Sequence, residues 1–311
     1  MDYYLPSLVA HADWSKSPKK RWMATARLRE DGKYIFYSLE PVGKLDNLLQ
    51  RLAKLSDHNG SILIGFDFPI GLPEIYARSA GITNFPSLLP RLGGPQWPEF
   101  YNTAVFPEQI SIKRPFYPYR PGGTKQSHLI KALGVKSINA LLRRCEKPLH
   151  NLPAAAPLFW TMGAKQVGKA AITGWREVLS PALNQKKVEI WPFHGTLSTL
   201  LKPGCFVIAE TYPALYYRHL QFNVRKTDPL SRISVGLNLV SWARMQNIIL
   251  DSSLKEKINN GFGSDPDGED PFDATVGLFG MLNVILGNQE EGVPDDPTIK
   301  TIEGWILGRT K

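Results

Sequence analysis

The sequence predicts an α/β protein built on a mixed β-sheet, with antiparallel strands at one flank and helices on both faces. Near the N-terminus, an apolar segment precedes two strand-like segments that have a hairpin turn signal between them. An amphipathic helical segment comes next, and a continuously apolar strand follows it. This order places an antiparallel pair beside strands joined by a helical crossover, which is typical of an α/β sheet.

The first three strands are predicted within residues 3–40. The apolar run in residues 3–14 indicates a buried strand that carries Asp13 near its end. Residues 21–30 and 32–40 are predicted to pair as a hairpin, because the Asp-Gly dipeptide between them is typical of tight turns. These three segments form the antiparallel flank.

The segment 44–60 is predicted to be a helix, because its leucines recur at helical spacing. Residues 61–73 form an almost continuous apolar run, as expected for a strand that is covered on both faces. In the second half of the chain, residues 188–193 and 205–213 are further strand candidates.

Two long helical segments are predicted near the C-terminus. Residues 233–261 have the pattern of one helix or of a broken pair of helices. Residues 270–287 form a last helix that becomes apolar all round, despite containing Gly277 and Gly280.

The composition is that of a globular protein with a sizeable core. The chain has 311 residues, of which 43% are hydrophobic and 21% are charged. Its two cysteines, Cys145 and Cys205, exclude a disulfide framework and favour a reducing compartment. The first residues lack the pattern of a secretory signal, and no stretch approaches the roughly 18 apolar residues of a membrane span. A soluble, cytoplasmic protein is therefore expected.

The formal net charge is +9, and it is concentrated in the middle of the chain. Residues 84–169 contain twelve Lys and Arg against three acids, whereas residues 261–296 contain nine acids and no Lys or Arg. Within the middle, residues 113–128 are rich in Pro and aromatics, which predicts irregular backbone. Basic groups interleaved with aromatic rings suit nucleic acid, either DNA or RNA, while the alternative is a solvated loop with its aromatics packed beneath. The candidate phosphate contacts are Lys113, Arg114, Arg120 and Lys125.

Acidic residues occur in or beside apolar elements, where an isolated charge is costly. They are Asp13, Asp67, Glu210, Asp270 and Asp273. Carboxylates that gather at neighbouring strand ends repel one another unless a divalent cation keeps them ionised. Oxygen ligands of this kind suit Mg²⁺ or Mn²⁺. A cluster of carboxylates is the ligand set expected in an enzyme that hydrolyses phosphodiester bonds with two metal ions.

Each acid except Asp67 also has an ordinary structural interpretation. Asp13 could stabilise a turn, and Glu210 could pair with an arginine in the core. Asp270 before Pro271 has the pattern of a helix N-cap, and Asp273 would then lie where the helix dipole favours an acid. Because residues three apart share a helix face, both acids of this helix could also point at one site.

Five short motifs, taken in order, resemble domain-of-unknown-function family 429. This family consists of predicted nucleases of the RNase H-like superfamily, close to the Holliday-junction-resolvase branch. Residues 84–187 have no counterpart, so the resemblance implies one RNase H-like domain over residues 1–311 with a basic, Pro- and aromatic-rich insertion. The motifs are DWSKSPKKRWMA (13–24), GFDFPIGLP (65–73), ETYPA (210–214), EDPFDATVGL (269–278) and EGWILG (303–308).

The resemblance also implies a catalytic site. In that superfamily the first strand supplies an Asp, the fourth strand an acid, and a late helix one or two acids three apart. Asp13, Asp67, Asp270 and Asp273 fill these places as ligands of Mg²⁺ or Mn²⁺. Glu210 would be an added ligand or a supporting group. The Asp-Pro start of the last helix departs from the usual pattern.

Three functions are compatible with these observations. The first is a metal-dependent nuclease that hydrolyses phosphodiester bonds. The second is an ATP-handling protein of the actin-like or sugar-kinase type, but the first hairpin lacks the glycine that would cradle a phosphate. The third is a catalytically inactive nucleic-acid-binding protein with the same fold. The presence of all four aspartates argues against this third function.

Overall fold

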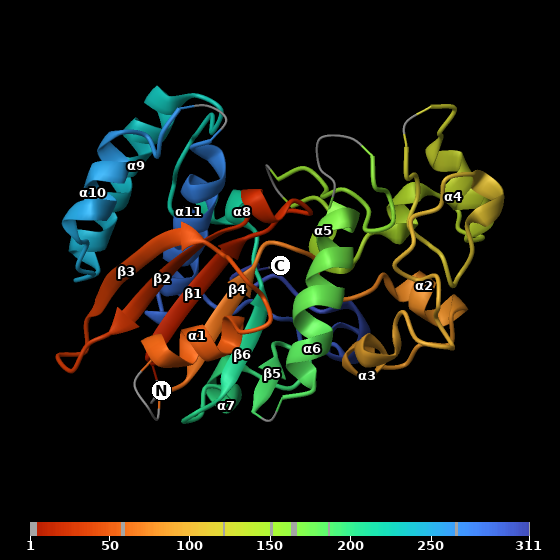
Figure 1. Ribbon diagram of the computed structural model, residues 1–311, viewed down its shortest axis with the longest axis horizontal. Coiled ribbons are helices and arrows are strands. Elements are labelled where there is room, and N and C mark those ends of the chain that lie inside the picture. The colour runs from red at the N-terminus through yellow and green to blue at the C-terminus, as the bar shows by residue number, and fades with distance from the viewer. Residues whose placement is uncertain are drawn as a thin grey trace.

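The described part of the chain contains a six-stranded mixed sheet in the order β3-β2-β1-β4-β6-β5 (Figure 1). The computed structural model describes residues 5–56, 60–120, 122–149, 152–162, 167–185, 187–264 and 267–310. Strand β2 is antiparallel to β1 and β3, whereas β4, β6 and β5 continue the sheet in parallel with β1. The predicted mixed sheet with an antiparallel flank is confirmed. The strands are β1 (Leu8–Asp13), β2 (Trp22–Leu28), β3 (Tyr34–Pro41), β4 (Ile62–Phe66), β5 (Val188–Ile190) and β6 (Phe206–Glu210).

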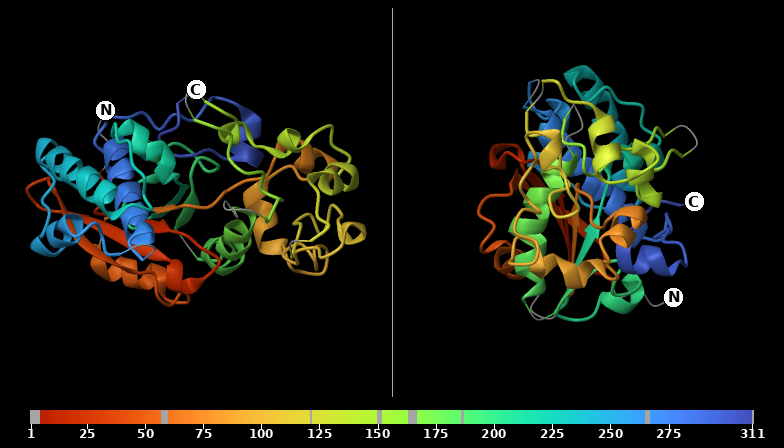
Figure 2. Two further views of the ribbon diagram at one scale, coloured as in Figure 1. Left: turned by 90° about the horizontal axis from the view of Figure 1, so that it is seen from above. Right: turned by 90° about the vertical axis from the view of Figure 1, so that its right-hand side faces the viewer.

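Each face of the sheet has its own hydrophobic core, because side chains alternate along a strand. In β1, Leu8, Ala10 and Ala12 belong to one core and Val9 to the other. Figure 2 shows helices on both sides of the sheet. The Val9 side is covered by α8 (Pro213–His219), α9 (Pro229–Met245), α10 (Ser252–Asn259) and α11 (Glu269–Ile285). The Leu8 side is covered by α1 (Leu48–Leu55), α5 (Val167–Gly174) and α6 (Ser180–Leu183).

The two glycines of α11 allow this helix to lie very close to its neighbours. A Cβ atom at Gly277 would lie 2.0 Å from the imidazole of His11 on β1, and one at Gly280 would lie 2.1 Å from the ring of Tyr216 on α8. His11 is fully buried, and its Nδ1 is 3.0 Å from the carbonyl oxygen of Ala274. The helix is therefore held tightly against β1, which fixes the position of its first turn.

The insertion contributes to the core on the Leu8 side of the sheet. It follows α2 (Glu74–Ser79) and includes α3 (Phe85–Leu88) and α4 (Gln126–Ala132). The described residues of 113–125 lack long regular elements, as predicted, and the rings of Phe116 and Tyr117 are buried beneath them. Residues 126–128, which were also predicted to be irregular, instead begin α4. Helices α5 and α6 are joined by a π-helical turn and pack beside the sheet. The end of the insertion is thus a layer of the sheet's own core.

Most predicted elements occur at the expected places. The segment predicted as one helix or a broken pair is the pair α9 and α10. Several short helices escaped prediction, among them α2, α7 (Leu197–Leu200) and α8, because none of these has enough residues to show a periodic pattern. Within the described ranges, no helix is both long and apolar enough to cross a membrane.

Candidate active site

Asp13 and Asp67 come together at the carboxyl ends of two parallel neighbours. Asp13 is the last residue of β1, and Asp67 directly follows β4. Ala12 pairs with Phe66, and the backbone N–H of Asp67 donates to the carbonyl oxygen of Ala12 at 3.1 Å. The pleat turns both aspartates toward the face that α11 covers. Strand register alone therefore places two carboxylates side by side.

The first turn of α11 adds two more aspartates. Gly268 is the N-cap of this helix, and no side chain of the described residues caps it. The expected N-cap role of Asp270 is therefore wrong: the helix begins at Glu269, two residues earlier than that role requires, and Asp270 lies within its first turn. Asp270 is half-buried, whereas Asp273 is only 5% exposed. One turn of helix brings both onto the same side.

The four aspartates line one cavity of about 590 Å³. Its walls come from the β1–β2 turn, the segment after β4, the insertion and the first residues of α8. Lysines and an arginine share this lining with the acids. The basic residues are Lys16, Lys20, Lys147, Lys169, Lys226 and Arg309.

Burial and mutual repulsion make the charged forms of these acids costly. Burial raises the pKa of Asp13 well above its usual range, and the charges of Asp273, Asp67 and Asp270 add to that increase. Burial also raises the pKa of Asp67 to about 8, with a further contribution from Asp273 and an opposing one from Lys226. The pKa of Asp270 is raised by burial against the opposing charge of Lys20. The cavity therefore favours an added positive charge.

Two functional candidates that the sequence did not indicate contact Asp273. The Lys226 ammonium lies 2.6 Å from Asp273 Oδ2, and the Tyr217 hydroxyl donates to Oδ1 of the same carboxylate. Lys226 belongs to the segment between α8 and α9, and its side chain is 44% exposed. Neither residue belongs to a recognisable motif, so only the fold connects them with the aspartates.

The donor set suits a hard divalent cation, because four carboxylates share one cavity. Their present arrangement is not a formed metal site: over the described ranges, no three His, Cys, Asp or Glu side chains stand close enough together to hold an ion. Asp273 gives one oxygen to Lys226 and the other to Tyr217. Lys226 thus supplies part of the positive charge that the acids require.

Glu210 borders the same cavity, and its charge adds to the raised pKa of Asp67, but its carboxylate is bound elsewhere. It pairs in register with Phe66, one position before Asp67, so the pleat turns the Glu210 and Asp67 side chains to opposite faces. Its carboxylate accepts two hydrogen bonds from Arg143, at 2.6 and 2.7 Å, and one from the N–H of Ile70 at 2.6 Å. The structure therefore favours the core pairing with an arginine over a role as ligand.

Arg143 connects the insertion to the segment that carries Asp67. It is fully buried and also pairs with Glu146 at 2.9 Å and with the carbonyl oxygen of Glu303 at 3.0 Å. Through Glu210 it holds Ile70, three residues after Asp67. Arg143 is thus placed as a positioning residue.

We expect Arg143→Met to lower the free energy of unfolding by about 3–5 kcal/mol, because it leaves Glu146 and Glu210 buried without a counter-charge. The neighbouring Arg144→Met is a matched control. Its guanidinium is 34% exposed, so we expect a loss of about 1 kcal/mol. Urea denaturation measures both values, and equal losses would contradict the central role of Arg143.

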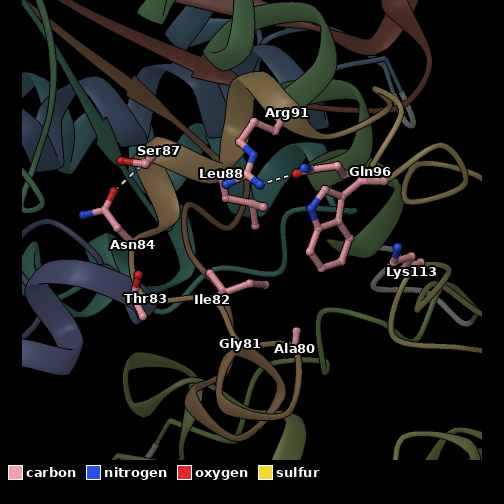
Figure 3. A pocket seen from close by; sticks show the side chains of 11 residues that line it. Ala80, Gly81, Ile82, Thr83, Asn84, Ser87, Leu88, Arg91, Gln96 and Lys113 are labelled. Carbon is pink, nitrogen blue, oxygen red and sulfur yellow. Dashed lines mark hydrogen bonds between the residues drawn. The ribbon is translucent and has the colours of Figure 1, made fainter.

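The predicted phosphate contacts of the insertion do not lie at this cavity. Lys113 borders a separate cavity of about 510 Å³, shown in Figure 3, which shares no lining residue with the first. Arg114 donates to the carbonyl oxygens of Asn102 and Thr103. Arg120 and Lys125 are exposed, and neither lines the cavity of the aspartates.

Comparison with known proteins adds little. No family model matches the sequence, so the resemblance to family 429 remains a prediction. No curated protein matches it either. Among solved structures, the chain is similar to the yeast mitochondrial Holliday junction resolvase Ydc2, with a TM-score of 0.38 and 11% identity over 92% of this chain and 82% of that one. So distant a likeness says nothing about activity.

Proposed function

We propose that this protein is a metal-dependent nuclease that hydrolyses phosphodiester bonds at the cavity lined by Asp13, Asp67, Asp270 and Asp273. One observation carries the proposal: buried and half-buried aspartates from β1, the end of β4 and α11 face one cavity, and the pKa values of Asp13 and Asp67 are raised by burial and by neighbouring aspartates. Such carboxylates are poised to exchange protons for a divalent cation.

The aspartates would hold Mg²⁺ or Mn²⁺, which when bound supplies an activated water and stabilises the leaving oxygen. Asp13 and Asp67 stand on a rigid sheet and provide the fixed part of the ligand set. Asp273 would complete this ligand set once its carboxylate is no longer bonded to Lys226, at 2.6 Å, and to Tyr217. The Lys226 ammonium would then stay in the cavity and be available to a phosphate oxygen of the substrate.

The test is hydrolysis of labelled nucleic acids by the wild-type protein. A panel of single-stranded, double-stranded and four-way-branched DNA, together with RNA, is incubated with Mn²⁺ or Mg²⁺ and with EDTA. We expect cleavage of at least one substrate with metal and none with EDTA. Asp13→Asn should be inactive, while Asp46→Asn, which changes an exposed carboxylate outside the cavity, should cleave normally. Intact substrates throughout the panel would overturn the proposal.

A further inference from the structure

The cavity of the aspartates has two basic walls that come from distant parts of the chain. One wall is the turn between β1 and β2, which carries Lys16 and Lys20. The opposite wall belongs to the insertion and carries Lys147 and Lys169. In Figure 1 the red turn lies beside α5, in agreement with the hydrogen bond between Trp14 and Thr173.

The β1–β2 turn is anchored to the insertion. The indole N–H of Trp14 donates to Thr173 on α5 at 3.1 Å. Arg21 is 3% exposed, lies over the Trp14 ring, and pairs with Glu177 at 2.9 Å. Arg21 also donates to the carbonyl oxygen of Ser15 at 2.6 Å. These bonds fix the spacing of the two walls without using the ammonium groups of the lysines.

The lysines of the two walls stand close enough to repel one another. Burial lowers the pKa of Lys169, and the charge of Lys16 lowers it further. Within the described ranges, neither lysine has a carboxylate at salt-bridge distance. On the same wall, the carbonyl oxygen of Lys147 accepts from Arg309 at 2.8 Å, which fixes the backbone there. Two like charges held together in this way form a site for an anion.

We propose that these walls grip a single nucleic-acid strand, with Lys16 and Lys169 binding the same phosphate from opposite sides. The proposal rests on the proposed function, because the strand is the substrate that would pass over the aspartates. It places the grip at the cavity itself and not at residues 113–125 of the insertion. Lys20 and Lys147 then lie beside neighbouring phosphates.

The shape and lining of the cavity favour a single strand over a duplex. A volume of about 590 Å³ is within the range of about 300–1,000 Å³ in which proteins bind small ligands, and it can hold only a few nucleotides. A duplex is much wider than this space. Tyr212 and Tyr217 line the cavity and are half-buried, so the exposed part of each ring can contact unpaired bases, while one face of Tyr217 is stacked on Phe272.

Binding of a fluorescein-labelled oligothymidylate, measured by anisotropy in EDTA, tests the proposal without any cleavage. We expect the double variant Lys16→Ala/Lys169→Ala to bind at least about tenfold more weakly than wild type. The slope of log K against log salt concentration should fall in magnitude by about 0.7, because the double variant loses one phosphate contact on a single strand. Unlabelled duplex should compete poorly.

Two control variants make the result specific. Lys131→Ala/Lys136→Ala removes the same charge from exposed positions of the insertion that line neither cavity, and should bind as wild type does. Lys16→Arg/Lys169→Arg keeps both charges and should retain binding. A larger loss for Lys113→Ala/Arg120→Ala than for the cavity pair would overturn the proposal.

Two further outcomes would also overturn it, namely tighter binding of duplex than of single strand, or absence of binding by wild type. Failure of the nuclease proposal is distinct: the strand would bind through Lys16 and Lys169 in EDTA, yet remain intact after metal is added. If the Lys16→Ala/Lys169→Ala variant cleaves nucleic acid as wild type does, strand binding by these two lysines is refuted, and the nuclease proposal stands.

Discussion

Asp67→Asn should reduce metal-dependent phosphodiester hydrolysis about a thousandfold or more, which is the order of effect found when a single charged catalytic group is removed. Asn keeps the shape of the side chain but is a neutral and weaker ligand for a hard cation. The backbone N–H of residue 67 bonds to Ala12 in either protein, so the strand register is preserved. Initial rates of cleavage under saturating Mn²⁺ measure the effect.

The exposed exchange Asp46→Asn is the control for Asp67→Asn. It removes one carboxylate and should leave the cleavage rate within twofold of wild type. The melting temperature of Asp67→Asn in EDTA shows that the variant is folded. If folded Asp67→Asn is fully active, Asp67 is not a catalytic ligand, even if Asp13→Asn is inactive.

Without divalent cations, the free energy of unfolding should fall by a few kcal/mol as the pH rises from about 4 to about 8. The pKa of Asp67 is 3.8 as a free side chain and about 8 in the folded protein. Between these values the unfolded chain releases the proton and the folded protein retains it, so rising pH favours unfolding. The stabilisation that comes from the proton on Asp67 is complete below pH 3.8 and is lost above about pH 8. Asp13 contributes with the same sign.

Urea denaturation at pH 5 and pH 8 in EDTA measures this dependence. Asp67→Asn should lose less stability between the two pH values than wild type, because its amide does not titrate. At pH 8 it should therefore be the more stable protein. Parallel pH profiles for wild type and Asp67→Asn would show that Asp67 has an ordinary pKa.

The sheet could be predicted from sequence because its strands are short apolar runs with local turn signals. The same patterns located Asp13 and Asp67, since a charged residue at the end of an apolar strand stands out. Their adjacency follows from the parallel pairing of β1 with β4, which the order of elements already implied. Gly277 seemed to weaken the last helix, but its missing side chain is what lets the helix lie against His11.

The rest of the site depends on contacts between segments that no local pattern connects. Glu210 looked like a ligand because it ends an apolar strand, and only the register shows that its side chain points to the face opposite Asp67. Arg143, its partner, is 67 residues away in the insertion. Lys226 lies between two helices in a polar segment with no motif. Arg114 appeared to be a surface cation, although its guanidinium is bound to backbone carbonyls.

A crystal structure of the wild-type protein with Mn²⁺, analysed by anomalous scattering, tests the metal-dependent site most directly. We expect anomalous density bridging the carboxylates of Asp13 and Asp67, with Lys226 moved away from Asp273. Manganese bound only elsewhere on the protein, with the Lys226–Asp273 pair still intact at 2.6 Å, would contradict a metal centre at these aspartates.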